Sequence, residues 1–513
     1  MKYLVILALL GLSLIFCLSC RHNRLKTNEK KIAAEINLLE NQKKEAEKIA
    51  LEKGPVDTLA KIPTGFLYKE DRSLDPTHPP VVINFSNEIP VRELKLSDVA
   101  TKVNYIVLQV PDDSVFFSWR TRLSFSSNKI IVYNILGINL FSYNGEFIET
   151  ICKNSFIGPR KFDPKGPFAA FFGPESFKGA MDTYQPNAGA AGNTVFYKFW
   201  DKPGENISLI KYSLNNKTQQ LIQPKSSEAG QKEFNNKGEN VVSEKMIKSP
   251  IDVPGLYYTN NVPISDNCYV GLPSGLLPFG KNGYLMVSFN LQGDTLCKFK
   301  QFDLPESPIT SSVYHTFYNQ NWVFGQLTTF KWAFNDTVFR MIPPNRLVPV
   351  YVFQLGKHKA TAEEWLHVNI SRDDKIIIRE IHENEHFIFI KYDYYVPGQK
   401  QPKSENALFD KSKNELYRVV LNDDRKNKIF DATAPNYSLT FGLENDLDNG
   451  LPFWPANVTT EGKLAISLMP EFLIKYIQRP EFKSSNDPKD KAFRDFVQTL
   501  QTGGRELIIM FVE

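Results

Sequence analysis

Residues 129–134 read KIIVYN, residues 140–143 read LFSY, and residues 146–151 read EFIETI. Their apolar, β-branched and aromatic side chains predict three short strands. Asn144-Gly145 separates the second strand from the third, and this dipeptide is the strongest short-range signal for a β-hairpin. The stretch therefore predicts consecutive antiparallel strands joined by tight turns.

The same order of strand, polar turn and strand recurs along the chain, with almost no helix predicted between the hairpins. The further predicted hairpins pair 207–214 with 218–222, 284–290 with 295–299, 375–381 with 386–392, and 415–421 with 428–430. Hairpins that return at irregular intervals favour an all-β fold, a β-propeller whose blades are four-stranded antiparallel sheets. A pair of β-sandwiches is the alternative.

Helices are predicted again only near the C-terminus. Residues 470–478 have apolar side chains at helical spacing, and Asp487-Pro488 resembles the N-cap and first position of a helix that continues to Leu500. The last apolar run, 506–512 (ELIIMFV), predicts a strand. A late strand of this kind fits closure of a propeller ring, in which the two ends of the chain complete one blade.

The first twenty residues indicate export. Lys2 is followed by the apolar run 3–18 and then by Ser19-Cys20, as in a bacterial lipoprotein signal peptide with Cys20 as the lipidated residue. An uncleaved transmembrane anchor is the alternative. The basic stretch 21–24 favours a periplasm-facing lipoprotein, held in the cell envelope by its lipid on the outer membrane.

Residues 28–53 predict a helix, because they lack Pro and Gly and are rich in good helix formers. The helix is expected to act as a solvated spacer, although weak self-association through a coiled coil is an alternative. The predicted domains are a signal peptide at 1–20, the helical spacer at 21–54, a linker at 55–92 and a six-bladed propeller at 93–513.

Charge and cysteine content narrow the function classes. Of the net charge of +4, Lys2 contributes one and residues 21–53 contribute three, so the remaining chain is neutral. A neutral body does not fit a nucleic-acid-binding protein. Beyond the signal peptide and Cys20, three cysteines remain, which allows one disulfide and a free thiol at most: Cys152, Cys268 and Cys297.

Several stretches resemble a known family. Residues 96–100 (LSDVA) with 105–108 (YIVL), and 130–133 with 140–147, resemble the opening of the six-bladed β-propeller lipoproteins of Bacteroidetes. The further matching stretches are 293–297, 335–340, 348–357 and 450–455. The resemblance covers residues 90–513 and implies a propeller in the cell envelope without a settled activity. Unlike many relatives, this chain lacks the glycine-rich turn after the first blade.

The sequence His382-Glu383-Asn384-Glu385-His386 spells H-E-x-x-H, the zinc-binding pattern of a peptidase family. That chemistry needs a helix, so that both histidines share one face and the glutamate activates the metal-bound water. The flanking residues, KIIIRE and FIFIKYDYY, predict strands instead. We therefore expect a hairpin tip with two solvent-exposed histidines and no zinc.

The remaining candidates are weaker. Ser274 does not fit a G-x-S-x-G nucleophile turn and is expected in a loop. Asp446, Asp448 and Asn449 offer oxygen ligands but lack the spacing of a calcium loop, so we expect a polar turn. Aspartate pairs are expected in turns at strand ends, at 112–113, 373–374 and 423–424. Six tryptophans are expected mostly in blade packing: Trp119, Trp200, Trp322, Trp332, Trp365 and Trp454.

No credible catalytic set, metal site or cofactor motif emerges. The sequence favours a lipid-anchored, non-catalytic binding or scaffold module for an envelope protein, a peptide or a glycan. Capture of a glycan or peptide through exposed aromatic side chains is one form of this function. The alternative is a metal-dependent hydrolase that resembles propeller lactonases, with its site at the mouth of the central channel.

Overall fold

The computed structural model divides the chain into two compact units, Met1–Gly65 and Phe66–Glu513. The residues it describes all belong to the second unit. They are 67–110, 117, 121–126, 128–134, 137–153, 188–200, 207–222, 258–273, 284–300, 320–325, 327–332, 334–366, 372–399, 401–423, 441–503 and 505–513. The predicted signal peptide, Cys20 and the spacer helix lie outside these residues, as does the 428–430 strand.

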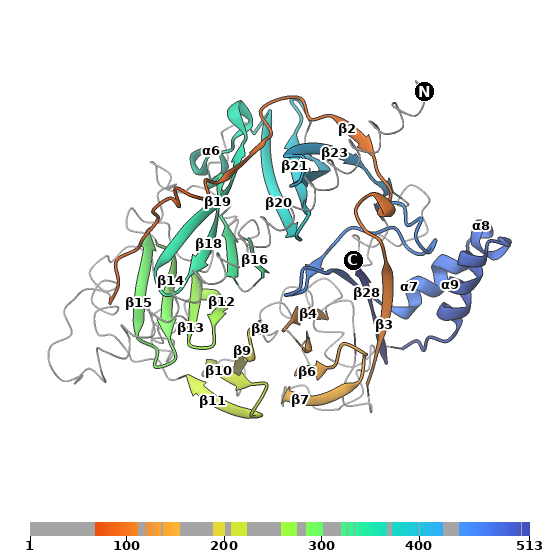
Figure 1. Ribbon diagram of the computed structural model, residues 1–513, viewed down its shortest axis with the longest axis horizontal. Coiled ribbons are helices and arrows are strands. Elements are labelled where there is room, and N and C mark those ends of the chain that lie inside the picture. The colour runs from red at the N-terminus through yellow and green to blue at the C-terminus, as the bar shows by residue number, and fades with distance from the viewer. Residues whose placement is uncertain are drawn as a thin grey trace, which may run out of the picture. The chain divides into compact units, whose positions relative to one another are not determined.

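The second unit is a six-bladed β-propeller with few helices, as the sequence predicts (Figure 1). Blade one holds β4 (Arg122–Phe125), β5 (Ile130–Asn134), β6 (Gly137–Phe141) and β7 (Phe147–Lys153). Blade two holds β8 (Ala188–Ala191), β9 (Thr194–Trp200), β10 (Ile207–Ser213) and β11 (Thr218–Ile222). Blade three holds β12 (Tyr258–Ser265), β13 (Cys268–Pro273), β14 (Tyr284–Asn290) and β15 (Thr295–Lys300).

The second half of the ring follows the same plan. Blade four holds β16 (Gln320–Phe324), β17 (Leu327–Lys331), β18 (Thr337–Ile342) and β19 (Arg346–Gln354). Blade five holds β20 (Lys375–Glu383), β21 (Phe387–Tyr395), β22 (Lys403–Asp410) and β23 (Glu415–Val420). Blade six holds β26 (Asn457–Val458), β27 (Leu464–Leu468), β28 (Glu506–Val512) and β3 (Val103–Gln109).

The first strand of each blade lies toward the centre of the ring. There β4 contacts β8 and β26, β8 contacts β12, and β20 contacts both β16 and β26. Successive residues of a strand point to opposite faces of its sheet, so each blade presents apolar side chains to both neighbouring blades. The core therefore consists of interblade layers, such as the cluster of Trp322, Val338, Phe353, Ile378 and Ile390 between blades four and five.

The hairpin predicted around Asn144-Gly145 is present, with β6 and β7 paired across the turn at residues 142–146. Gly145 has φ +90, a conformation that favours glycine. A Cβ atom there would also overlap the carbonyl oxygen of Val107 in blade six. Gly145 thus serves both the turn and the contact between blades one and six.

The N-terminal part of the propeller, residues 67–110, runs along the outer side of blades three to six and is here called the strap (Figure 1). Within it, β1 (Val81–Asn84) adds a parallel fifth strand to β19, and β2 (Val91–Glu93) adds one to β23. The strap ends in β3, which pairs antiparallel with β28. The predicted closure of the ring by the last strand is therefore confirmed, because C-terminal β28 and β3 from the strap pair in blade six.

Two segments differ from the sequence expectation. Residues 81–84 and 91–92 of the expected linker 55–92 belong to strands of the propeller, because the outer edges of blades four and five offer them backbone partners. Asn422–Asp423, expected in a turn, is instead a short strand, β24, that pairs with β25 (Phe441–Gly442), while the expected partner strand 428–430 lies outside the described residues.

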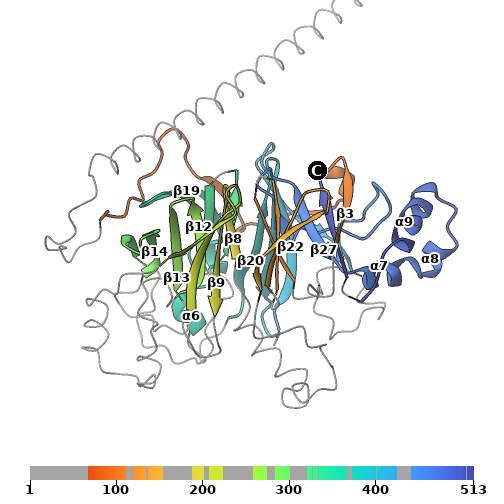
Figure 2. The same cartoon turned by 90° about the horizontal axis from the view of Figure 1, so that it is seen from below.

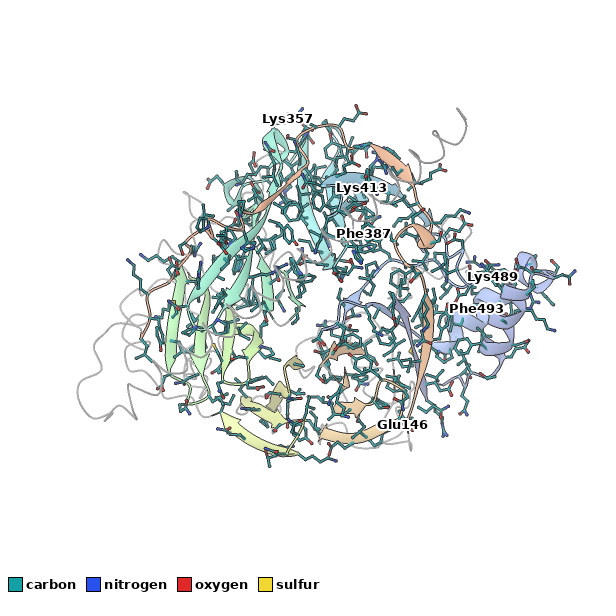
Figure 3. The ribbon with its side chains drawn as sticks, in the orientation of Figure 1. Glu146, Lys357, Phe387, Lys413, Lys489 and Phe493 are labelled. Atoms are coloured by element: carbon teal, nitrogen blue, oxygen red, sulfur yellow. The ribbon has the colours of Figure 1, made fainter. Side chains whose placement is uncertain are left out.

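The C-terminal helices α7 (Pro470–Ile477), α8 (Pro480–Lys483) and α9 (Pro488–Gln498) lie between β27 and β28 in the chain and beside β3 in space (Figure 2). As predicted, Asp487 caps α9 by accepting a hydrogen bond from the Lys489 amide at 2.8 Å. Phe493 of α9 packs on Tyr105 of β3, with ring centroids 5.6 Å apart (Figure 3). No helix among the described residues is long and apolar enough to span a membrane.

Candidate functional site

The H-E-x-x-H segment is a hairpin tip, as its flanks predict. β20 ends at Glu383 and β21 begins at Phe387, and the Asn384 side chain closes the turn. Its Oδ1 accepts hydrogen bonds from the amides of His386 at 3.0 Å and Phe387 at 2.7 Å. The two histidines therefore share no helical face, and the geometry of a zinc peptidase is not present.

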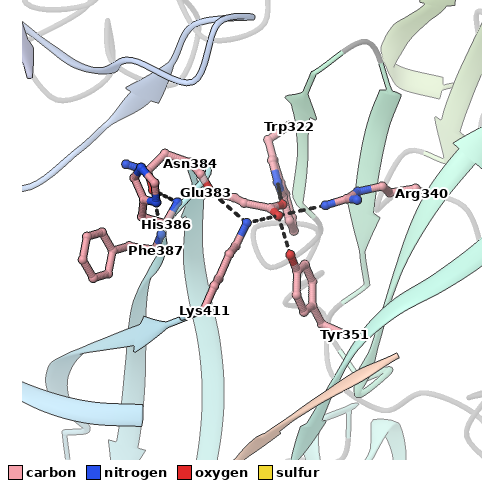
Figure 4. Close-up of polar contacts among 8 residues, drawn as sticks. All are labelled: Trp322, Arg340, Tyr351, Glu383, Asn384, His386, Phe387 and Lys411. Atoms are coloured by element: carbon pink, nitrogen blue, oxygen red, sulfur yellow. Dashed lines mark hydrogen bonds and ion pairs between the residues drawn. The ribbon is translucent and has the colours of Figure 1, made fainter. Parts of the chain in front are cut away.

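Glu383 is the centre of a buried polar cluster, here called the Glu383 cluster (Figure 4). Its carboxylate is fully buried and accepts four hydrogen bonds. Oε1 accepts from Arg340 Nη2 at 2.8 Å and Lys411 Nζ at 2.7 Å. It also accepts from the Tyr351 hydroxyl at 2.5 Å, while Oε2 accepts from Trp322 Nε1 at 3.0 Å.

The cluster joins two blades. Trp322, Arg340 and Tyr351 come from β16, β18 and β19 of blade four, whereas Glu383 ends β20 of blade five. Lys411 lies in the turn after β22 and also donates to the Asn384 carbonyl at 2.7 Å. The sequence around Glu383 does not predict these four partners, because only the packing of blade four on blade five brings them together.

Two cations face one carboxylate, so the formal charge of the cluster is +1. The Arg340 guanidinium and the Lys411 ammonium both lie over the Phe324 ring, 4.5 and 4.4 Å from its centroid. Their side chains keep 21% and 19% of their surface exposed, while that of Glu383 keeps none. The positive charge therefore reaches solvent and the negative charge does not.

The cluster holds Glu383 in its ionised form. Burial raises the pKa of the carboxyl, but the charges of Arg340 and Lys411 and the hydrogen bonds from Lys411 and Tyr351 outweigh it. The pKa of Glu383 consequently lies below its ordinary value. Burial lowers the pKa of the Lys411 ammonium, with Glu383 opposing that shift. Burial also raises the pKa of the Tyr351 hydroxyl, which remains a neutral donor.

This arrangement is unsuited to general-base catalysis. A base needs a free lone pair within reach of the proton that it abstracts. Both oxygens of Glu383 already accept hydrogen bonds from neighbouring side chains, and the carboxylate has no exposed surface. In the structure the glutamate of the H-E-x-x-H sequence serves as an ion bridge between blades four and five.

The two histidines of the motif have different surroundings. His386 is exposed, as expected, whereas His382 is half-buried and on the opposite side of β20 from Glu383. Burial lowers the pKa of His382 to about 4, so its ring is neutral at physiological pH. The expectation of two exposed histidines is thus wrong for His382, because its strand places the ring against the face that packs toward blade six.

The acidic segment before Gly450 is a polar turn, as expected. Asp446 accepts hydrogen bonds from the amide and hydroxyl of Ser97, at 3.0 and 2.6 Å, and so joins the strap to the segment between β25 and β26. Asp448 accepts from the Gly450 amide at 2.9 Å. Among the described residues, no three His, Cys, Asp or Glu side chains gather as a metal-binding group.

Of the aspartate pairs, 373–374 is fully described. Asp374 has φ +60 just before β20, and its carboxylate accepts from the Tyr394 hydroxyl at 2.9 Å and lies 3.1 Å from Lys357 Nζ. It therefore shapes a strand end, as expected. Ser274, the pair 112–113 and Asp424 lie outside the described residues.

The tryptophans and cysteines with described side chains lie in the packing of the blades. Trp322, Trp332 and Trp454 are at most 9% exposed, in line with their predicted packing role. The three cysteines are buried free thiols, and burial raises the pKa of each to about 12: Cys152, Cys268 and Cys297.

Comparison with known proteins gives a family and distant structural likenesses. No curated protein matches the sequence. The chain is similar to a DUF4221 family member from Bacteroides vulgatus, with 10% identity over 80% of this chain and 97% of that one and a TM-score of 0.32. It is also similar to the β-propeller domain of the Trilobed protease from Pyrococcus furiosus, with 6% identity over 59% and 72% of the two chains and a TM-score of 0.26.

The family model described as a domain of unknown function, DUF4933, matches residues 63–479. This range includes the strap (67–110), blades one to five and the Glu383 cluster. The chain belongs to the DUF4933 family.

Proposed function

We propose that the chain is a lipid-anchored propeller of the cell envelope that acts as a non-catalytic binding or scaffold module for a protein, a peptide or a glycan. One observation carries the non-catalytic part. The glutamate in the sequence's best catalytic motif is a buried interblade ion bridge with four hydrogen-bond donors. The fold supports binding, because a propeller presents many turns on two faces around a rigid ring.

The turn at His386 is a suitable place to test for a partner. It is exposed, and it lies at the end of the blade where the cations of the Glu383 cluster reach solvent. A photo-cross-linking amino acid at position 386 of the full chain, irradiated in intact cells, should give a discrete adduct. The control position is Gln399, which is exposed in the turn at the other end of β21.

The outcomes separate the two function classes. An adduct from position 386 but not from 399 supports a binding module that uses this face. The proposal would be overturned if neither position gave an adduct while the purified mature protein hydrolysed a lactone or ester in a metal-dependent manner. That result would favour the enzyme that the sequence leaves as the alternative.

The proposed anchor depends on Cys20, which follows Ser19 at the end of the apolar run. Wild-type protein should incorporate labelled palmitate and sediment with the outer membrane, whereas Cys20→Ala should incorporate none. If the variant and the wild type both kept the full signal peptide by mass, the segment would be an uncleaved anchor instead. Resistance to external protease in intact cells would support the periplasm-facing orientation.

A further inference from the structure

Thr329 of β17 lies in the same cross-strand row as two members of the Glu383 cluster. It is paired with Arg340 of β18 on one side and with Trp322 of β16 on the other. The preceding residue, Thr328, donates its hydroxyl to the Pro263 carbonyl of blade three at 3.3 Å. Since neighbouring residues in a strand point to opposite faces, Thr329 points toward blade five and the Glu383 cluster.

Two buried polar atoms in this row make no hydrogen bond with any described residue. They are the Thr329 hydroxyl, on a side chain that is fully buried, and the Nε of Arg340. The Arg340 guanidinium uses Nη2 for Glu383. Because buried polar groups in proteins are nearly always hydrogen-bonded, a donor pair of this kind points to an acceptor beyond the described residues.

The charges around this pair favour an anion. Arg340 and Lys411 together exceed Glu383 by one positive charge, and the aromatic ring of Phe324 lies beneath both cations. Lys411 uses two of its three N–H donors, for Glu383 and for the Asn384 carbonyl. Glu385 also acts electrostatically on Lys411, but it is exposed to solvent.

We propose that Arg340, Lys411 and Thr329 bind a carboxylate group at the junction of blades four and five. A carboxylate has two oxygens that accept hydrogen bonds from a guanidinium and a neighbouring donor, and its single charge neutralises the cluster. A phosphate dianion would leave an excess of negative charge beside Glu383. The inference rests on the proposed binding function and names the chemical class that this surface recognises.

Acetate is the probe that tests the site. The full mature chain is titrated with [13C]acetate at constant ionic strength, with chloride as the replaced ion, and binding is followed by NMR line broadening. We expect saturable binding by the wild type. Thr329→Val keeps the shape of the side chain and should raise the dissociation constant roughly ten- to hundredfold, as expected for one hydrogen bond to a charged group.

Thr328→Val is the matched control. It makes the same change one residue away, on the opposite face of β17, and removes the bond to Pro263 rather than a donor to the site. Its acetate affinity should equal that of the wild type even if its stability falls. Arg340→Gln should weaken binding by tenfold or more, and its fold is checked by its unfolding transition.

The inference is overturned if the wild type shows no saturable acetate binding or if Thr329→Val binds acetate as tightly as the wild type. The first result would mean that ordered water satisfies the two donors, and the second that Thr329 does not contact the carboxylate. If acetate binds as expected, N-acetylglutamate amide and glucuronate are compared as probes, since an acidic peptide and an acidic sugar both carry a carboxylate.

Failure of this site and failure of the proposed function are distinguishable. A cross-linked adduct from position 386 without acetate binding would remove only the carboxylate site. Acetate binding without an adduct at either position would support the carboxylate site and contradict binding of a partner at this face.

Discussion

Glu383→Gln is the substitution that tests the interblade ion bridge most sharply. Glutamine keeps the shape of the side chain and removes its charge, so Arg340 and Lys411 are left as two partly buried cations without their buried counter-ion. Removing one partner of a buried ion pair costs about 3–5 kcal/mol of folding free energy. We expect a loss near the lower end, about 3 kcal/mol, because both cations keep roughly a fifth of their surface in solvent.

Equilibrium unfolding in urea, followed by tryptophan fluorescence, measures this loss through the shift of the midpoint at an unchanged slope. Heat is a less sensitive probe. With roughly 2 cal/mol/K of unfolding entropy per residue, about 3 kcal/mol shifts the melting temperature of the Phe66–Glu513 unit by only about 3 °C.

Glu444→Gln is the matched control, because it makes the same chemical change in an exposed pair. Glu444 lies 3.2 Å from Lys95, and both side chains are 54% exposed. Such surface pairs contribute about 1 kcal/mol or less. If Glu383→Gln cost no more than Glu444→Gln, the account of Glu383 as a structural ion bridge would be refuted.

Three further predictions concern the acid range of stability, the turn glycine Gly145 and the buried thiols. Because the pKa of Glu383 is lower in the folded chain than in the unfolded chain, its contribution is complete above about pH 4.5 and is lost as the pH falls through the folded value. Urea midpoints of the wild type and Glu383→Gln should accordingly converge in acid, and a constant gap down to pH 3 would contradict this sign. Gly145→Ala should destabilise more than Gly398→Ala: both glycines have positive φ, but only the first would bring a Cβ onto Val107. Backbone strain alone costs about 1–2 kcal/mol, so equal losses would show that the contact with blade six is unimportant. Native protein at pH 8 should not react with a maleimide at its buried thiols, and denatured protein should react at all of them, namely Cys152, Cys268 and Cys297.

The parts of the fold that were predicted from sequence are those that local chemistry determines. The hairpin of β14 and β15 follows from alternating apolar runs around Gly293, and α9 begins where Asp487 and Pro488 place its cap. The last strand is apolar from Leu507 to Val512 because both of its faces are buried, one in the cluster shared with blade one and the other in the cluster shared with blade five and the C-terminal helices. Each of these signals is contained in fewer than about twenty residues.

The parts that were missed depend on distant partners. β1 reads only VVIN and β2 only VRE, too short for any propensity to mark them, and the edges of blades four and five decide their conformation. The four partners of Glu383 come from positions 322 to 411, on different strands and turns. The H-E-x-x-H pattern did draw attention to Glu383, but its match to a zinc motif says nothing about the ion bridge that the residue forms.

A crystal structure of the mature protein, grown with acetate, tests the central claim most directly. The account predicts residues 382–386 as a hairpin tip, with the Glu383 carboxylate enclosed by Trp322, Arg340, Tyr351 and Lys411. It also predicts a carboxylate within hydrogen-bonding distance of Thr329 Oγ1 and Arg340 Nε. A helix at 382–386, with both histidines on one metal ion and Glu383 open to solvent, would contradict it.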